Sequence, residues 1–230
     1  MRSIFSKSTD FNQDVYRNIV SLRESRDLFD DLTDGDPELS SLAIEAEARV
    51  KENIPKGLIE RGYHYSQAIG YPFETQPFMA SRYGDGKFGV WYGSVDRMET
   101  TIFESSYHMI QDESNIEGLN EIVVRERAVY LIHCEAILFD IVGKEKAFPQ
   151  LVANDYSFTQ AIGRRLSQEG HPGLLAPSAR CKGINSVIFN PEVLDSPRHH
   201  CYLTYHLDPA TRKVEVERQP GEILMVVDFA

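Results

Sequence analysis

The feature that most limits the folds open to this chain is the apolar stretch in residues 123–142, which contains VYLIHCEAILFDIV. We predict that it forms one or two β-strands. Shorter apolar runs separated by turn residues follow it along the chain and predict further strands. They are LLAP, NSVIFN, CYLTYHL, KVEVE and EILMVVDF. The second half of the chain is therefore expected to be built mainly of sheet.

Two helices are predicted between these strands. The first follows Asp96, which is a typical capping residue, and its expected buried stripe is Phe103, Tyr107 and Ile110. The second begins at Asp155. Its apolar side chains repeat every four residues: Phe158, Ile162 and Leu166. Two earlier segments, GYHYSQ at residues 62–67 and FGVWY at residues 88–92, predict strands.

Residues 1–56 are predicted to form an N-terminal helical cap in front of a domain that spans residues 57–230. The clearest helix of the cap begins at Asp36, with Pro37 in its first turn. Its apolar residues keep helical spacing: Leu39, Leu42, Ala43, Ala46 and Val50. Helices followed by a mixed β-sheet with flanking helices indicate an α+β fold.

Composition excludes several classes of function. The formal charge of −11 argues against a broad surface for nucleic acid or for an anionic membrane, so an anion would need a local basic pocket. The cysteines Cys134, Cys181 and Cys201 include no CxxC pair, and the histidines His199, His200 and His206 follow no metal-ligand pattern. We therefore expect no metal. Without an apolar leader or a run of about 18 apolar residues, we expect a cytoplasmic protein.

The segment SRYGDGKFGVWYGS, residues 81–94, is the first candidate for a functional site. Its glycines at positions 84, 86 and 89 allow a ligand to approach the backbone, and the forked guanidinium of Arg82 suits a phosphate. Gly-Asp-Gly is also a common hairpin turn, so an ordinary turn is the alternative. The spacing matches neither the GxGxxG fingerprint nor a P-loop.

Two further candidates are an acid on the first predicted helix and a serine after a strand. Glu104 lies beside the expected buried stripe, where a carboxylate needs a partner. It is either a functional group or a structural ion pair with Arg97 or Arg82. Ser178 follows Pro177 at a strand end, but no GxSxG elbow surrounds it. A hydrogen bond to phosphate or ribose therefore suits Ser178 better than a role as nucleophile.

Taken in order, these elements resemble the RES domain family, which is named for its arginine, glutamate and serine. The resemblance runs from about Gly62 to about Pro191, through YHY, SRYGDGKFGVWYGS, the helix that carries Glu104, NDYSFTQAIGRRL and GLLAPSARCKGINSVIFNP. By this resemblance Arg82, Glu104 and Ser178 are catalytic residues. Tyr92 matches the family's strand tyrosine and would bind substrate.

The resemblance also assigns more distant residues to substrate binding. Ser157 and Gln160 match polar positions of the later helix, and Tyr65 matches an aromatic position of the first strand. His64 stands where many relatives have an arginine, so a phosphate contact there would be weaker and dependent on pH. The arginines that could compensate are Arg82, Arg180 and Arg61.

The family includes bacterial toxins of toxin–antitoxin pairs that consume NAD+. The resemblance therefore implies a fold like that of ADP-ribosyltransferases and cleavage of NAD+ at the nicotinamide–ribose bond. NAD+ would be a substrate, no cofactor would be needed, and inorganic phosphate or water would be the acceptor. An antitoxin, in this family often a helix-turn-helix repressor, is the implied partner. A transferase that modifies another molecule, and a nucleotide-binding relative without turnover, remain alternatives. The oligomeric state stays open.

Overall fold

The coordinates are a computed structural model that describes residues 4–21, 66–74, 76–113, 116 and 118–229. The described residues form one mixed β-sheet with a few helices, which is the α+β class that the sequence predicts. Within the described part of the chain, no helix has the length and apolar character needed to cross a membrane.

Eight strands make up the sheet, in the order β1-β2-β5-β4-β3-β6-β7-β8. Their bounds are Ser8–Val20 (β1), Trp91–Ser94 (β2), Val123–Asp140 (β3), Gly173–Pro177 (β4), Ile184–Ile188 (β5), Leu194–Asp208 (β6), Lys213–Gln219 (β7) and Glu222–Asp228 (β8). Only the β3–β4 pairing among them is parallel. Because β1 also pairs with β3, the pairings β1–β2–β5–β4–β3–β1 close a circuit of strands.

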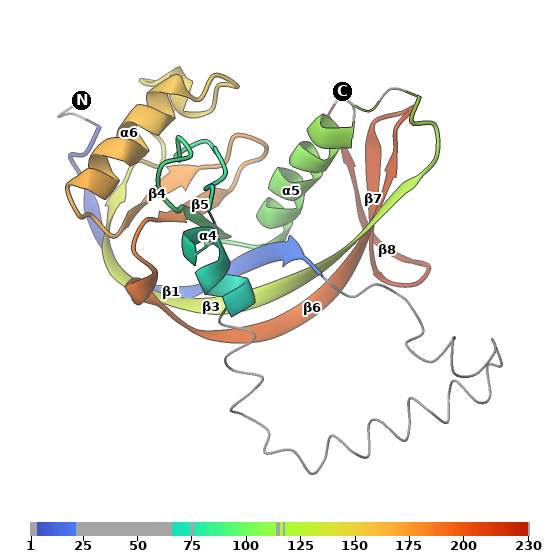
Figure 1. Ribbon diagram of the computed structural model, residues 1–230, viewed down its shortest axis with the longest axis horizontal. Helices are drawn as coiled ribbons and strands as arrows, with labels where there is room; N and C mark the ends of the chain where they lie inside the picture. The colour runs from blue at the N-terminus through green and yellow to red at the C-terminus, as the bar shows by residue number, and fades with distance from the viewer. Residues whose placement is uncertain (1–3, 22–65, 75, 114–115, 117, 230) are drawn as a thin grey trace, which may run out of the picture.

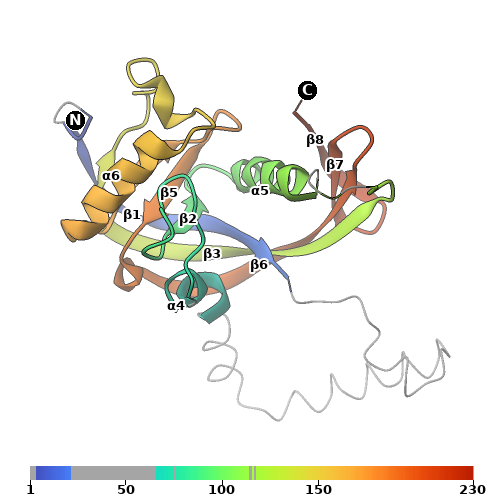
Figure 2. The same ribbon diagram turned by 45° about the horizontal axis from the view of Figure 1, so that its top comes forward.

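The long apolar stretch is confirmed as a single strand, β3, which pairs with β1 on one side and with β6 on the other. The five later apolar runs are confirmed as well, and they lie in β4, β5, β6, β7 and β8. Figures 1 and 2 show β1, β3 and β6 as long curved strands that extend beneath the two main helices. These strands are the floor on which the rest of the domain is built.

The two predicted helices are also confirmed, as α5 (Met98–Glu113) and α6 (Ser157–Gln168). They lie on the same side of the long strands and toward opposite ends of them (Figures 1 and 2). Shorter helical segments complete the fold: η1 (Ser66–Gly70), α4 (Tyr71–Glu74), η2 (Pro149–Leu151) and η3 (Pro191–Val193). The buried side of α5 differs slightly from expectation. Ile102, Ser106 and Met109 are buried, whereas Phe103 and Tyr107 are partly buried and make edge-on ring contacts with Phe229.

The N-terminal helical cap is wrong for residues 8–20, which form β1. Each of its 13 residues pairs with β3. Its apolar side chains Phe11, Val15 and Ile19 are spaced by four, which suits one face of a helix and one face of a strand equally well. Pairing with the long strand decides between them. The helix predicted from Asp36, and the boundary at residue 56, lie outside the described residues.

The two early strand predictions fare differently. In GYHYSQ, residues 62–65 lie outside the described residues, and Ser66 begins η1 rather than a strand. In FGVWY, the strand begins at Trp91 instead of Phe88. The preceding backbone packs on α4, where a Cβ added to Gly89 would lie 2.4 Å from the carbonyl oxygen of Pro72. That close packing keeps residues 88–90 out of the sheet.

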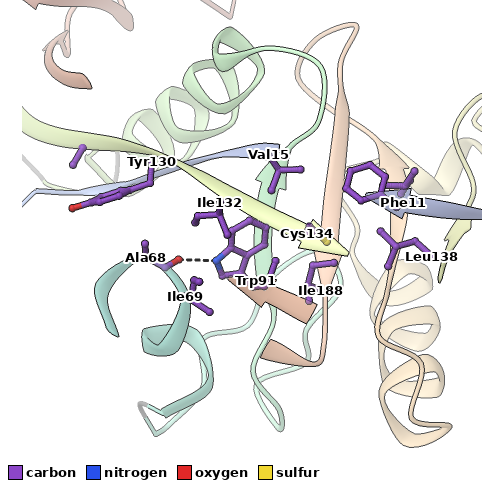
Figure 3. Packing of buried hydrophobic residues seen from close by; sticks show 13 residues of the cluster. Phe11, Val15, Ala68, Ile69, Trp91, Tyr130, Ile132, Cys134, Leu138 and Ile188 are labelled. Atoms are coloured by element: carbon purple, nitrogen blue, oxygen red, sulfur yellow. Dashed lines mark hydrogen bonds between the residues drawn. The ribbon is translucent and has the colours of Figure 1, made fainter. Parts of the chain in front are cut away.

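Trp91 is the centre of one hydrophobic cluster, which Figure 3 shows from close by. Its ring is fully buried, and its Nε1–H donates to the carbonyl oxygen of Ala68 at 2.7 Å. Val15 of β1 and Ile132 of β3 lie against the same cluster. The N-terminal strand therefore contributes to the core of the domain instead of covering it from outside.

Truncating Val15 tests this role of β1. Val15→Ala should lower the free energy of unfolding by roughly 2–3 kcal/mol, because a fully buried side chain loses methyl groups and leaves a cavity. Val20→Ala, on the same strand but 58% exposed, should change it by less than about 0.5 kcal/mol. Urea unfolding followed by circular dichroism measures both. Equal effects of the two substitutions would show that β1 is not part of the core.

Candidate functional site

A cavity of about 360 Å³ brings together residues from distant parts of the sequence. It is lined from β1, from the loop before β2, from α5, from the first residues of β3 and from the ends of β4 and β5. Arg82, Tyr92 and Glu104 all lie on its wall. The arginine and the carboxylate singled out in the sequence thus face one shared space.

Arg82 is held in place from two sides. One terminal nitrogen, Nη1, donates to the carbonyl oxygens of Ala153 at 2.6 Å and Leu151 at 3.3 Å. The guanidinium carbon lies 4.5 Å from the centroid of the Tyr156 ring. The other terminal nitrogen, Nη2, is buried and has no hydrogen-bond partner. A buried N–H without a partner is costly, so this donor is suited to a ligand.

The loop that carries Arg82 is fixed by the side chains of Tyr92 and Gln160. The Tyr92 hydroxyl accepts from the backbone N–H of Tyr83 at 2.8 Å and lies 2.8 Å from Ser81 Oγ. The Gln160 amide donates to the carbonyl oxygens of Ser81 at 3.0 Å and Gly84 at 3.3 Å. Gln160 therefore supports the loop from α6 and does not line the cavity.

Burial raises the pKa of Tyr92 to about 12, although its hydrogen bond with Ser81 acts in the opposite direction. The phenol consequently stays protonated at neutral pH and is unsuited to act as a base. Tyr92 contributes its ring to the cavity wall, while its hydroxyl positions the loop.

Close packing of α6 against the same loop depends on Gly163. A Cβ at this position would lie 1.8 Å from the carbonyl oxygen of Tyr83, which no side chain tolerates. Nothing in the sequence separates this glycine from an ordinary helix residue, and sequence reasoning missed it.

Glu104 is oriented by two donors that come from the strands beside α5. Its Oε1 accepts from the hydroxyl of Ser178 at 2.6 Å and from the amide of Asn185 at 2.9 Å. Ser178 Oγ in turn accepts from the backbone N–H groups of Arg180 and Cys181, at 3.1 Å and 3.3 Å. Among the described residues, Glu104 Oε2 has no hydrogen bond. The structure thus holds one oxygen of the carboxylate and leaves the second one available.

This arrangement gives Ser178 a supporting position beside Glu104. Its hydroxyl donates to the carboxylate and is fixed by two backbone donors, which is typical of an orienting group. Asn185, which shares that task, was missed because it lies within the apolar run NSVIFN. Tyr156 was missed as well, because no motif around it in the sequence indicates a contact with Arg82.

The remaining candidates lie farther from this centre or outside the described residues. Arg180 donates to Asn154 at 2.9 Å and to the hydroxyl of Tyr156 at 3.3 Å, and it stacks on Tyr107. Ser157 is exposed and donates to Asp155 at 2.9 Å, so it forms part of the start of α6 and not of the cavity. His64 and Tyr65 lie outside the described residues, and nothing is assigned to them.

Comparison with known proteins now identifies the family. The model of the RES domain matches residues 56–208, which is more than half of the chain and includes the whole segment over which the sequence resembles that family. The chain belongs to the RES domain family. Arg82, Glu104 and Ser178 all fall within the matched residues, whereas β1 precedes them.

Among solved structures, the Mycobacterium tuberculosis MbcT–MbcA toxin–antitoxin complex is similar to this chain at 14% sequence identity. The similarity covers 89% of each chain, with a TM-score of 0.47. No curated protein matches the sequence. In the part of the RES chain that the structure describes, no group of three or more His, Cys, Asp or Glu side chains is placed to hold a metal ion.

The Tyr92 hydroxyl gives a test of how the Arg82 loop is held. Tyr92→Phe should lower the free energy of unfolding by about 1–3 kcal/mol, because it leaves the Tyr83 N–H without its acceptor. Tyr107→Phe is the matched control, since its hydroxyl makes one long contact, 3.4 Å from Asn154. Chemical denaturation of both variants decides the point. If Tyr92→Phe costs no more than Tyr107→Phe, the hydroxyl does not fix the loop.

Proposed function

We propose that this RES domain protein is a toxin of a toxin–antitoxin pair that cleaves NAD+ at the bond between nicotinamide and ribose. Membership of the RES family supports the class of reaction. The single observation that carries the proposal for this chain is the shared cavity. It places a guanidinium with an unused donor, Arg82, and an oriented carboxylate, Glu104, around one space.

The chemistry of NAD+ cleavage suits this pair. Nicotinamide leaves from a cationic ring and needs little help from an acid. The ribosyl centre becomes positively charged as the bond breaks, and a nearby carboxylate stabilises that charge. In this proposal Glu104 does so through its unoccupied oxygen, while Ser178 and Asn185 keep the carboxylate in one orientation.

The phosphate groups of the dinucleotide are assigned to Arg82. Its Nη1 is engaged with backbone carbonyls, so the guanidinium cannot swing away, and its Nη2 is the donor that a phosphate oxygen would use. The aromatic side chains of the wall include Tyr83, Tyr92 and Tyr156, and nicotinamide or ribose would pack against this part of it. Arg180 remains a candidate for substrate contacts beside this centre, and His64 and Tyr65, which lie outside the described residues, remain candidates as well.

NAD+ is a substrate in this mechanism, and no cofactor is required. The acceptor of the ribosyl group is inorganic phosphate or water, and the product distinguishes them. The proposed partner is an antitoxin protein, of the helix-turn-helix type that the family implies, which would cover the cavity in the resting complex.

Turnover of NAD+ by the purified chain tests the proposal. The wild-type protein should release nicotinamide from NAD+. Chromatography measures this release in reactions run with and without phosphate. Glu104→Gln should reduce the rate by about 100-fold or more, since it removes the charge and keeps Oε1 as an acceptor for Ser178 and Asn185. Glu99→Gln, five residues earlier on α5 and not part of the cavity wall, is the matched control and should retain the activity.

Three outcomes separate the alternatives. Loss of NAD+ with a phosphorylated or a free ADP-ribose product identifies phosphate or water as the acceptor. Label that stays on a protein or on a small molecule would identify a transferase instead. If wild-type protein binds NAD+ and releases no nicotinamide under either condition, the chain is a binding relative and the proposed reaction is wrong.

A further inference from the structure

A second cationic group lines the same cavity, and one of its two members comes from outside the part of the chain that the family model matches. It consists of Arg17 on β1 and Arg127 on β3. Arg17 precedes residues 56–208, so the N-terminal strand adds to the cavity a residue that the RES match does not contain. The two guanidinium groups lie close enough for the charge of Arg127 to lower the pKa of Arg17.

Arg17 is anchored at one end and has unused hydrogen-bonding capacity at the other. Its Nη1 donates to the backbone carbonyl oxygen of Tyr92 at 2.6 Å, and its guanidinium lies 5.2 Å from the Trp91 ring centroid. Its Nε is buried and has no hydrogen-bond partner. The side chain is therefore fixed beside the cavity with a donor left over, which repeats the situation of Arg82.

Arg127 is positioned by neutral groups. Its Nε donates to the Asn18 side-chain oxygen at 2.6 Å, and its guanidinium lies 5.5 Å from the Tyr205 ring centroid. Among the described residues, neither Arg17 nor Arg127 forms an ion pair with a carboxylate. A third arginine at the same cavity, Arg125, does form one, with Glu113. The charge of Arg125 is therefore neutralised within the protein. No carboxylate among the described residues does the same for Arg17 or Arg127.

Two neighbouring cations without a counter-ion are unfavourable. Burial, and then the charge of Arg127, lowers the pKa of Arg17 to about 10, and burial also lowers the pKa of Arg127. Both groups remain cationic at neutral pH. An anion placed between them would remove the repulsion and satisfy the free Nε donor.

We propose that Arg17 and Arg127 form an oxyanion subsite that binds a phosphate group inside the cavity of Glu104. The assignment rests on the proposed function, in that a phosphate-bearing ligand enters this cavity. The same chemistry has two sources, the pyrophosphate of the dinucleotide and free inorganic phosphate. Tetrahedral oxyanions with several acceptor oxygens match the forked donors of two arginines.

Binding of inorganic phosphate is the first measurement, made by titration calorimetry at constant ionic strength without NAD+. Wild-type protein should bind phosphate, and Arg17→Met and Arg127→Met should each weaken that binding by about tenfold or more. The control is Arg198→Met, which removes the same charge from β6, where Arg198 pairs with Asp14 of β1 away from the cavity. It should leave phosphate binding unchanged.

The second measurement is NAD+ binding to Glu104→Gln protein, with and without the Arg17→Met change. If the subsite holds the pyrophosphate, Arg17→Met weakens NAD+ binding about tenfold and free phosphate competes with NAD+. If it holds the acceptor phosphate, NAD+ binding stays the same and only phosphate binding falls. Arg127→Met repeats each measurement without disturbing the bond from Arg17 to Tyr92, so a folding defect of Arg17→Met does not obscure the answer.

The proposal is overturned if neither phosphate nor NAD+ binding depends on Arg17 and Arg127, or if Arg198→Met produces the same loss. Its failure is distinguishable from failure of the proposed function. Protein that binds phosphate through the two arginines but releases no nicotinamide would retain the subsite and reject the reaction. Protein that turns over NAD+ with unchanged constants after Arg17→Met and Arg127→Met would retain the reaction and reject the subsite.

Discussion

The pairing of β1 with β3 is the constraint on which the rest of the structure depends. It joins the N-terminus of the chain to its longest strand over all 13 residues of β1, and β1 also reaches β2. The circuit of strands is closed through these contacts, and the Trp91 cluster is filled from β1 by Phe11 and Val15. Because β2 follows the loop of Arg82, the same pairing fixes one side of the cavity. A strand outside the matched family region thus supports the region inside it.

Much of the fold follows from local patterns in the sequence, and what does not follow depends on contacts made at a distance. The β3 stretch and the later strands are recognisable because their apolar runs are continuous or bounded by turns. In β1 the apolar residues are few and spaced by four, a pattern that also suits a helix. The segment forms a strand because it pairs with the long strand β3. Similarly, the sequence of residues 88–90 is typical of a strand, but in the structure Gly89 packs closely on the backbone of Pro72 in α4. The local sequence of a segment does not specify such contacts with other parts of the chain.

The candidate site divides in the same way. Arg82, Tyr92 and Glu104 could be placed together from the sequence because they lie near one another in order and match the family's motifs, and the structure puts all three at one cavity. Their supports could not be placed. Asn185 and Tyr156 come from segments that look purely structural, and Gln160 proves to support the loop instead of facing the ligand space. Arg17 reaches the cavity through a strand that sequence reasoning assigned to a helical cap.

The polar groups of the cavity are of two kinds: those that form hydrogen bonds within the protein and those that have no partner in it. Most donors and acceptors are used within the protein: the Tyr92 hydroxyl on the loop, Arg82 Nη1 on carbonyl oxygens, and Glu104 Oε1 on Ser178 and Asn185. These bonds leave each functional side chain with restricted freedom, which lowers the entropic cost of binding a ligand. Among the described residues of the cavity wall, the groups without a partner include one nitrogen on Arg82, one on Arg17, the hydroxyl of Tyr83 and the second carboxylate oxygen of Glu104. In the proposed reaction, the two arginine nitrogens would donate to the phosphate oxygens of the ligand, and the free carboxylate oxygen would stabilise the positive charge that develops on the ribose.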